Sequence, residues 1–166
     1  PVLDGVDIQK CAAESGGGVY VSHTPLRLKN VSMIDCQGIW GSALRVQQQV
    51  TLTWEGGKVV SSTSRDGGAV LVVYYNNMHP KLNFQGVSFE DNAQNGFTGY
   101  PNDEWRHSGG AITVARYGDP TSIELSFKSC LFLRNTARRY GGAVYLSGNT
   151  KAASFQNCLF QGNNAP

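Results

Sequence analysis

The amino-acid sequence predicts an all-β fold, a right-handed parallel β-helix of about six coils with no capping helix. Two repeated segments and a turn-rich composition lead to this prediction. Only 16% of the 166 residues are charged and 20 are glycine, whereas 40% are hydrophobic and can form a core. The apolar residues recur two apart in short runs, as in β-strands, and the 3.6-residue period of helices is missing.

The first repeat is a nine-residue segment that occurs six times, beginning at residues 3, 28, 54, 84, 127 and 155. Its first and sixth residues are apolar, its third is Gly, Asn or Ser, and its ninth is Cys, Ser or Asn. Strands this short cannot bury a core alone, so we expect the copies to stack with equivalent residues in columns. Asn suits such a column because it tolerates left-handed backbone and its amide can bond to the next amide. The predicted Phe and Asn columns are Phe84, Phe127 and Phe155; Phe89, Phe132 and Phe160; and Asn92, Asn135 and Asn163.

The second repeat follows the first and starts with two small residues. It reads Gly-Gly-Ala followed by Val or Ile at residues 67–70, 109–112 and 141–144, and it continues as a short strand. The glycines are expected at a tight corner, where φ is positive or the next coil lies too close for a Cβ. A β-sandwich of short strands is the alternative fold, but it does not explain why six segments share four positions.

These motifs resemble the repeats of the polymorphic outer membrane proteins, in which FxxN and GGA[IV] segments alternate. The FxxN segments are residues 89–92, 132–135 and 160–163. The match is specific over residues 67–166 and weaker over 1–66, where Cys or Ser replaces the Asn and Ile, Met or Val replaces the Phe. The resemblance implies a β-helix of the pectin-lyase-like kind and a role as an extracellular adhesin or surface scaffold.

The ends of the repeat array predict association with further structure. A β-helix without caps exposes unpaired strand edges at both ends. We therefore expect residues 1–166 to be a single β-helix segment of a longer solenoid, or one that associates end-on or laterally. No signal peptide precedes Pro1, so a mature or internal segment is expected.

The four cysteines fall into two pairs of equivalent positions. Cys11 and Cys36 share the ninth position of successive copies, and Cys130 and Cys158 share the fourth. Stacked residues lie about 4.8 Å apart, within the Cα separation that a disulfide allows. Two hypotheses stay open: disulfides between coils in an oxidising compartment, or reduced cysteines that act as small buried hydrophobic residues.

A candidate binding site lies in the insertion over residues 93–108, which is much longer than the equivalent segments of the other coils. Insertions in repeat proteins project from one face and often carry the binding function. Aromatic and charged side chains suit a sugar ring or a protein partner, and the alternative is an Ω-loop packed on itself. The candidates, including the next corner, which we expect beside the insertion, are Phe97, Tyr100, Trp105, Arg106, Arg138, Arg139 and Tyr140.

Other function classes are disfavoured by the sequence. Asp103, Glu104 and His107 could form an acid–base set, but the repeats contain no column of carboxylates and no zinc-ligand spacing. We expect no catalytic residue, no metal and no cofactor. A net charge of +2 argues against nucleic acid as a partner, and the longest apolar run, residues 70–75, is too short to span a bilayer.

The leading hypothesis is a non-catalytic extracellular or cell-surface scaffold or adhesion segment that binds other proteins or glycans. The alternative is a carbohydrate-binding or carbohydrate-active module, lyase-like or hydrolase-like, with its site in the insertion. Asn30 begins an N-glycosylation sequon and is predicted to face solvent, which agrees with a secretory route.

Overall fold

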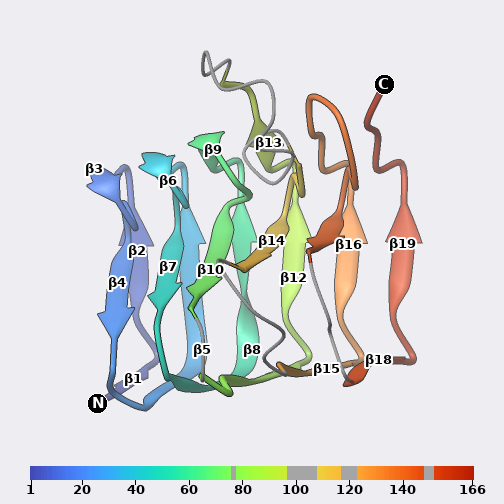
Figure 1. The fold of residues 1–166 in the computed structure, drawn as a ribbon. Helices are drawn as coiled ribbons and strands as arrows, with labels where there is room; N and C mark the ends of the chain where they lie inside the picture. Colours follow the sequence, from blue (N-terminus) through green and yellow to red (C-terminus); the bar gives the residue numbers. More distant parts are fainter. Residues whose placement is uncertain (76–77, 97–107, 117–122, 148–151) are drawn as a thin grey trace.

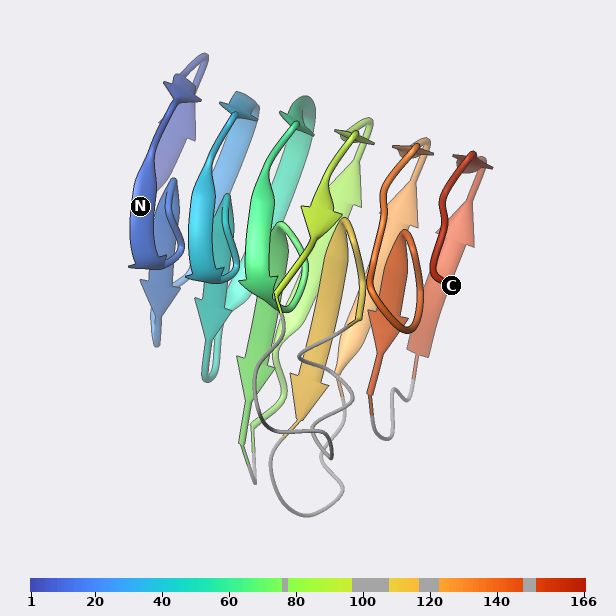
Figure 2. The same ribbon diagram turned by 90° about the horizontal axis from the view of Figure 1, so that it is seen from above.

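The computed structural model describes residues 1–75, 78–96, 108–116, 123–147 and 152–166, and it shows a parallel β-solenoid (Figure 1). The coils lie side by side in chain order, with the two termini at opposite ends of the stack (Figures 1 and 2). The first four coils contribute strands to three sheets, the fifth to two and the sixth to one, and the paired strands within the described residues run parallel. The β-sandwich alternative is therefore wrong.

The strands divide among three sheets, which we call the long, corner and return sheets. The long sheet contains β1 (Val2–Asp4), β2 (Asp7–Gln9), β5 (Leu26–Ile34), β8 (Thr51–Val60), β11 (Lys81–Gln85), β12 (Ser88–Glu90), β15 (Glu124–Lys128), β16 (Leu131–Leu133), β18 (Ala152–Gln156) and β19 (Leu159–Gln161). The corner sheet contains β3 (Ala12–Ser15), β6 (Gln37–Trp40), β9 (Thr63–Asp66) and β13 (Ala93–Gln94). The return sheet contains β4 (Val19–Ser22), β7 (Leu44–Gln47), β10 (Val70–Tyr74), β14 (Ile112–Arg116) and β17 (Val144–Leu146).

The register of the long sheet confirms the predicted columns. Phe127 pairs with Phe84 on one side and with Phe155 on the other, and Phe132 likewise pairs with Phe89 and Phe160. The rings stack nearly parallel, with centroids 4.9 Å apart for Phe84 and Phe127 and 5.1 Å apart for Phe89 and Phe132. These separations match the spacing of adjacent strands, so the backbone repeat sets the ring contacts.

The core fills the interior of the coils. Inward side chains alternate with more exposed ones along several strands, as in β11, where Leu82 and Phe84 are buried between exposed neighbours. On the outer face of the long sheet, ion pairs join residues of successive coils, among them Arg27 with Glu55 and Lys81 with Glu124. These pairs are exposed, so each contributes at most about 1 kcal/mol, and the buried columns carry most of the stability.

Two left-handed residues bend the nine-residue segment of every coil. The third residue of each nine-residue segment, which is Gly, Asn or Ser, has positive φ. The eighth also has positive φ, although it is Lys10, Asp35, Ser61, Asp91, Arg134 or Gly162. The expectation that the ninth-position Asn takes the left-handed conformation is wrong, because the residue before it absorbs the bend.

The paired glycines serve the two purposes that the sequence predicted. The first of each pair has positive φ, for example +73° at Gly67 and +69° at Gly109. The second meets neighbouring backbone: a Cβ on Gly68 would collide with the carbonyl oxygen of Gly109, and one on Gly110 with that of Gly142. Close packing of successive coils at this corner therefore requires glycine.

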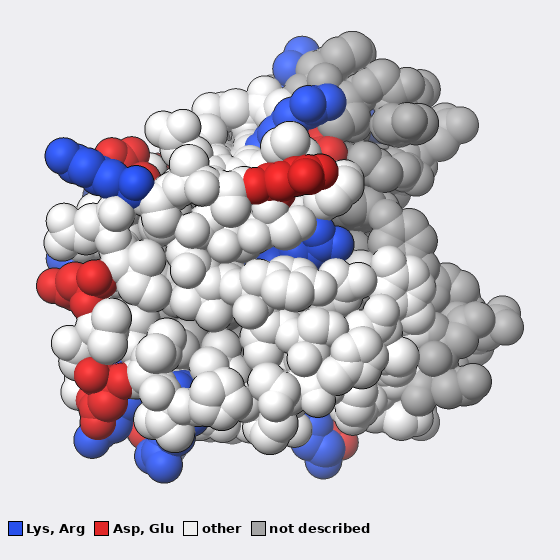
Figure 3. Space-filling view, turned by 90° about the vertical axis from the view of Figure 1, so that its left-hand side faces the viewer, with Lys and Arg blue, Asp and Glu red and all other residues white. Residues whose placement is uncertain are grey.

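The two ends of the stack expose apolar side chains. At the N-terminal end Val2 is exposed, and Figure 3 shows a broad uncharged area on this face. At the C-terminal end Phe155, Leu159 and Phe160 are exposed, whereas the Phe residues one coil earlier are buried. The stacking that buries the inner columns thus leaves the terminal members uncovered on one side.

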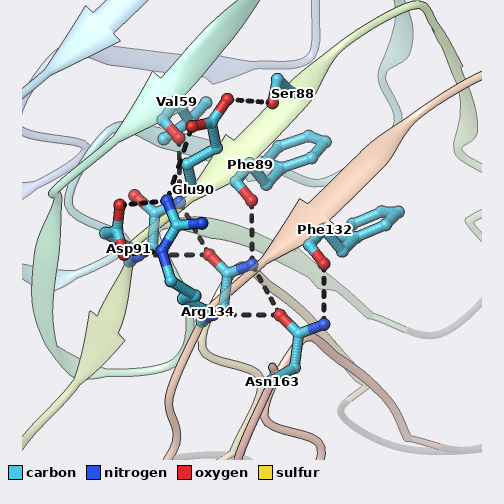
Figure 4. Close-up of polar contacts among 10 residues, drawn as sticks. Val59, Ser88, Phe89, Glu90, Asp91, Phe132, Arg134 and Asn163 are labelled. Atoms are coloured by element: carbon cyan, nitrogen blue, oxygen red, sulfur yellow. Dashed lines mark hydrogen bonds and ion pairs between the residues drawn. The ribbon is translucent and has the colours of Figure 1, made fainter. Parts of the chain in front are cut away.

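The Asn column forms a continuous hydrogen-bonded chain (Figure 4). Asn135 donates from Nδ2 to the carbonyl oxygen of Phe89 at 2.9 Å, and its Oδ1 accepts from Nδ2 of Asn92 at 2.9 Å. Asn163 accepts in the same way from Asn135. Toward the N-terminus Ser62 takes the place of Asn and accepts from the backbone N–H of Cys36. The predicted amide-to-amide bonding is confirmed.

The two cysteine pairs differ in state. Cys11 and Cys36 form a disulfide between the first and second coils, with their Cα atoms 4.7 Å apart. Cys130 and Cys158 are free thiols, and burial raises the pKa of the Cys130 thiol. Each free thiol donates to backbone carbonyl oxygens, Cys130 to that of Phe84 and Cys158 to that of Phe127. The disulfide hypothesis thus holds for the first pair and the buried-thiol hypothesis for the second.

Replacing Asn135 by Ala is expected to lower the free energy of unfolding by about 3 kcal/mol. The change leaves the buried carbonyl of Phe89 and the amide of Asn92 without their partners, and each such loss costs about 1–3 kcal/mol. Asn83→Ala, on the exposed face of β11, is the control and is expected to change stability by less than about 0.5 kcal/mol. Equal effects of the two variants in urea unfolding would contradict a special role of the Asn column.

Reduction of the disulfide is expected to lower the free energy of unfolding by about 3.5 kcal/mol, because the bond closes a loop with a sequence separation of 25. Thermal melting with and without dithiothreitol measures the effect. Cys158→Ala is the control and should leave the response to dithiothreitol unchanged. Thiol titration of the unfolded, unreduced chain should give two free thiols, and a count of four would contradict the assignment.

Candidate functional site

The outer face of the corner sheet forms an open groove that runs along the solenoid axis, and we call it the corner groove. It has a volume of about 780 Å³ and crosses β3, β6 and β9, which lie in a row in Figure 1. A second hollow, of about 360 Å³, lies at residues 136–138 of the fifth coil. Asn95 lines both this hollow and the corner groove, so the hollow continues the groove onto the fifth coil. The lining residues are Ala12, Ala13, Glu14, Gln37, Gly38, Ile39, Thr63, Ser64, Arg65, Asn95 and Gly96.

Local sequence explains why this face is hollowed. The strands of the corner sheet are short, and small side chains such as Ala12 and Thr63 keep the floor low. Alternate residues turn inward instead. Ser64 and Gln94 are buried and bond to backbone groups, so they close the corner from inside.

The groove carries few charges. Glu14 and Arg65 are exposed at equivalent places on β3 and β9, and Arg138 lies at the hollow of the fifth coil. At the turn before β13, the Arg134 guanidinium donates to both carboxylate oxygens of Asp91, at 2.7 and 2.8 Å. Those hydrogen bonds hold the pKa of Asp91 below its usual value, so the carboxylate stays ionised. The lining thus combines alanine, glycine and isoleucine with a few amide and hydroxyl groups and single charges.

Gln94 joins three coils beneath the groove. Its Nε2 donates to the carbonyl oxygens of Arg65 at 2.6 Å and Gly96 at 3.3 Å, while its Oε1 accepts from the backbone N–H of Arg138 at 3.2 Å. The side chain is buried, so these bonds have no competition from water. One residue therefore fixes the groove floor and the point where the insertion leaves it.

The described ends of the insertion lie beside the fifth coil. Ala93 forms a parallel bridge with Thr136, and Ser108 forms one with Tyr140. Arg138, Arg139 and Tyr140 are exposed there, with the Arg139 guanidinium 5.1 Å from the centroid of the Tyr140 ring. The structure therefore brings this predicted corner next to the base of the insertion. Its role in binding stays a prediction.

The remaining candidates lie outside the described residues. They are Phe97, Tyr100, Trp105 and Arg106, together with Asp103, Glu104 and His107. Asn30 is exposed as expected, and its glycosylation stays a prediction.

Sequence analysis missed an aromatic cluster between the corner and return sheets. The Arg45 guanidinium lies 5.1 Å from the ring centroid of Trp40 and 5.9 Å from that of Tyr20, and its Nη1 donates to Ser15. Trp40 donates from Nε1 to the buried carboxylate of Asp66 at 3.1 Å. The sequence could have indicated that Tyr20 and Arg45 are neighbours, because they occupy equivalent positions after the small-residue pairs. The direction of their side chains follows only from the fold.

The described lining of the corner groove contains few acidic residues. Among the described lining residues of the groove, Glu14 is the one carboxylate, whereas glycoside hydrolysis usually needs two. The described residues contain no group of three or more His, Cys, Asp or Glu that could hold a metal ion. In that same part of the chain, no helix is long and apolar enough to cross a membrane.

Comparisons of the chain with protein-family models, with curated proteins and with solved structures found no significant match.

Gln94→Glu is expected to lower the free energy of unfolding by about 2 kcal/mol, although the two side chains have nearly the same shape. The carboxylate keeps an acceptor for Arg138 but cannot donate to the carbonyl oxygens of Arg65 and Gly96. Hydrogen exchange should accelerate at residues 95–96, while the long sheet changes little. Gln37→Glu, exposed on β6, is the control, and an equal loss of stability there would refute the role of Gln94.

Proposed function

We propose that this chain is a non-catalytic extracellular or cell-surface scaffold segment whose corner groove binds an extended partner, a surface glycan or a stretch of protein. The observation that carries the proposal is the path of the groove along the axis of a stiff solenoid, from the first coil to the fifth. A polymer lying along such a groove meets the lining residues of successive coils in turn, among them Gln37, Thr63 and Asn95. Rigid presentation also avoids the loss of conformational freedom that weakens binding.

Two further features support an extracellular setting. The Cys11–Cys36 disulfide indicates an oxidising environment. The alternating FxxN and GGA[IV] segments resemble those of the polymorphic outer membrane proteins, and surface adhesion is the role that this resemblance implies. The low charge of the groove favours a neutral or weakly charged partner over a polyanion.

A carbohydrate-binding or carbohydrate-active module is the second candidate. The open, largely apolar lining of the groove favours it, because ligand sites commonly combine apolar surface with a few polar groups, here Gln37, Thr63 and Asn95, that fix the orientation of the ligand. The insertion would then supply the aromatic platform, with Trp105 as the best candidate from the sequence. This candidate differs from the scaffold hypothesis in requiring a defined glycan, and an enzyme would also release products.

The test is binding to a glycan array and to immobilised extracellular-matrix proteins by wild type and two matched variants. Thr63→Trp fills the floor of the groove, and Thr53→Trp places the same bulk on the outer face of the long sheet. We expect Thr63→Trp to weaken binding at least ~10-fold, with unchanged melting, and Thr53→Trp to bind like wild type. Equal binding by all three proteins would exclude the groove.

Further measurements separate the candidates. Loss of binding in Trp105→Ala but not in Thr63→Trp would move the site to the insertion. Release of reducing ends or unsaturated sugars from bound polysaccharide would establish the carbohydrate-active alternative. Absence of binding to every glycan and matrix protein tested would reject both.

A further inference from the structure

The hydrogen bonds of the Asn column have a fixed direction. Asn92 donates from its backbone N–H and from Nδ2 to a single acceptor, Oδ1 of Asn135 in the next coil, at 3.1 and 2.9 Å. Asn135 repeats both bonds to Oδ1 of Asn163, at 3.0 and 2.9 Å. The second Nδ2 proton of each Asn points back to a carbonyl oxygen of the previous coil. Each coil thus receives a side-chain carbonyl from the coil on its C-terminal side.

Asn163 makes only those hydrogen bonds of this pattern that join it to the previous coil. Its Nδ2 donates to the carbonyl oxygen of Phe132 at 2.8 Å, and its Oδ1 accepts both bonds from Asn135 (Figure 4). Its backbone N–H and its other Nδ2 proton have no acceptor among the described residues. Two aligned donors therefore face outward from the C-terminal end, at the spacing that one amide oxygen satisfies in the inner coils.

The apolar columns next to these donors are uncovered at the same end. Phe155 is 40% exposed and Phe160 is 47% exposed, whereas Phe127 and Phe132 one coil earlier are fully buried. Strands β18 and β19 are exposed along their whole length and pair only with β15 and β16 within the described residues. The face therefore combines two aromatic rings, a free strand edge and two unsatisfied amide donors.

We propose that this C-terminal face binds a parallel β-coil presented by another β-solenoid segment. The coil would cover Phe155 and Phe160 with apolar side chains and place the side-chain carbonyl of an Asn over Asn163. Strand pairing gives the affinity, and the amide acceptor gives the register, because a shift by one residue would move the carbonyl away from both donors. The surface is separate from the corner groove and does not depend on its function.

A second copy of this chain is a poor occupant. Its first coil would bring Leu3 and Ile8 over the two rings, but its ninth residue is Cys11, which is bonded to Cys36 and has no side-chain carbonyl. The N-terminal face has a broad uncharged area, so charge repulsion does not oppose stacking of a second copy there (Figure 3). The missing acceptor is what disfavours it. Two copies joined by their C-terminal faces would bring donors against donors at Asn163.

The test extends the chain after Pro166 with a copy of residues 139–166, which places copies of Phe155, Phe160 and Asn163 over the originals. Hydrogen exchange of the original Asn163 amide is expected to slow at least ~100-fold relative to the natural chain. The matched control carries the same extension with Leu in place of the copied Asn163, and there the Asn163 amide should exchange nearly as in the natural chain. No slowing in the first protein, or equal slowing in both, would overturn the proposal.

A second measurement avoids any failure of the extended chain to fold. A synthetic peptide with the sequence of residues 152–164 is titrated into the isotope-labelled natural chain, followed by NMR. Saturable shifts at the Asn163 amide and the rings of Phe155 and Phe160 would support the proposal, as would their loss with an Asn163→Leu peptide. Head-to-tail oligomers of the natural chain in sedimentation experiments would instead identify a second copy as the occupant and overturn it.

Discussion

Stacking of equivalent residues at the spacing of a parallel β-ladder is the constraint on which this structure depends. Because each coil repeats the one before it, a side chain meets its own counterpart above and below, and this holds for polar and apolar columns alike. The phenylalanine rings satisfy it by lying nearly parallel, with centroids 4.5 to 5.1 Å apart. The asparagines satisfy it with a chain of amide bonds that would be costly to leave unmade in a buried column.

The same constraint is met by different chemistry at the two ends of the chain. In the first two coils a disulfide joins the ninth positions, and a serine then links this covalent part to the asparagines. A covalent link needs no further acceptor, whereas an amide column always leaves donors at one end. The two end faces of the solenoid therefore differ, and the hydrogen bonds between the asparagines all point toward the C-terminal end.

The two proposed binding surfaces lie on different parts of the solenoid. The corner groove lies along the side, where small residues and the base of the insertion leave an open path over several coils. The C-terminal face lies across the axis and is suited to another coil. A rod that binds along its side and extends at its end can hold partners at fixed distances, which agrees with a role as a surface scaffold.

The sequence by itself determined the parallel β-solenoid, the stacked columns, the glycine corners and the positions where cysteines pair, because residues that repeat in a stack must each fit their own copies. It could not decide which cysteine pair is bonded, since each pair occupies equivalent positions of successive coils. Nor could it find the left-handed residue before the Asn column, because the residue types there are mixed, from Lys and Arg to Asp, Ser and Gly, and form no repeated signal. The corner groove and the roles of Gln94 and Arg45 likewise follow from the tertiary structure alone, because they depend on contacts between coils whose loops differ in length.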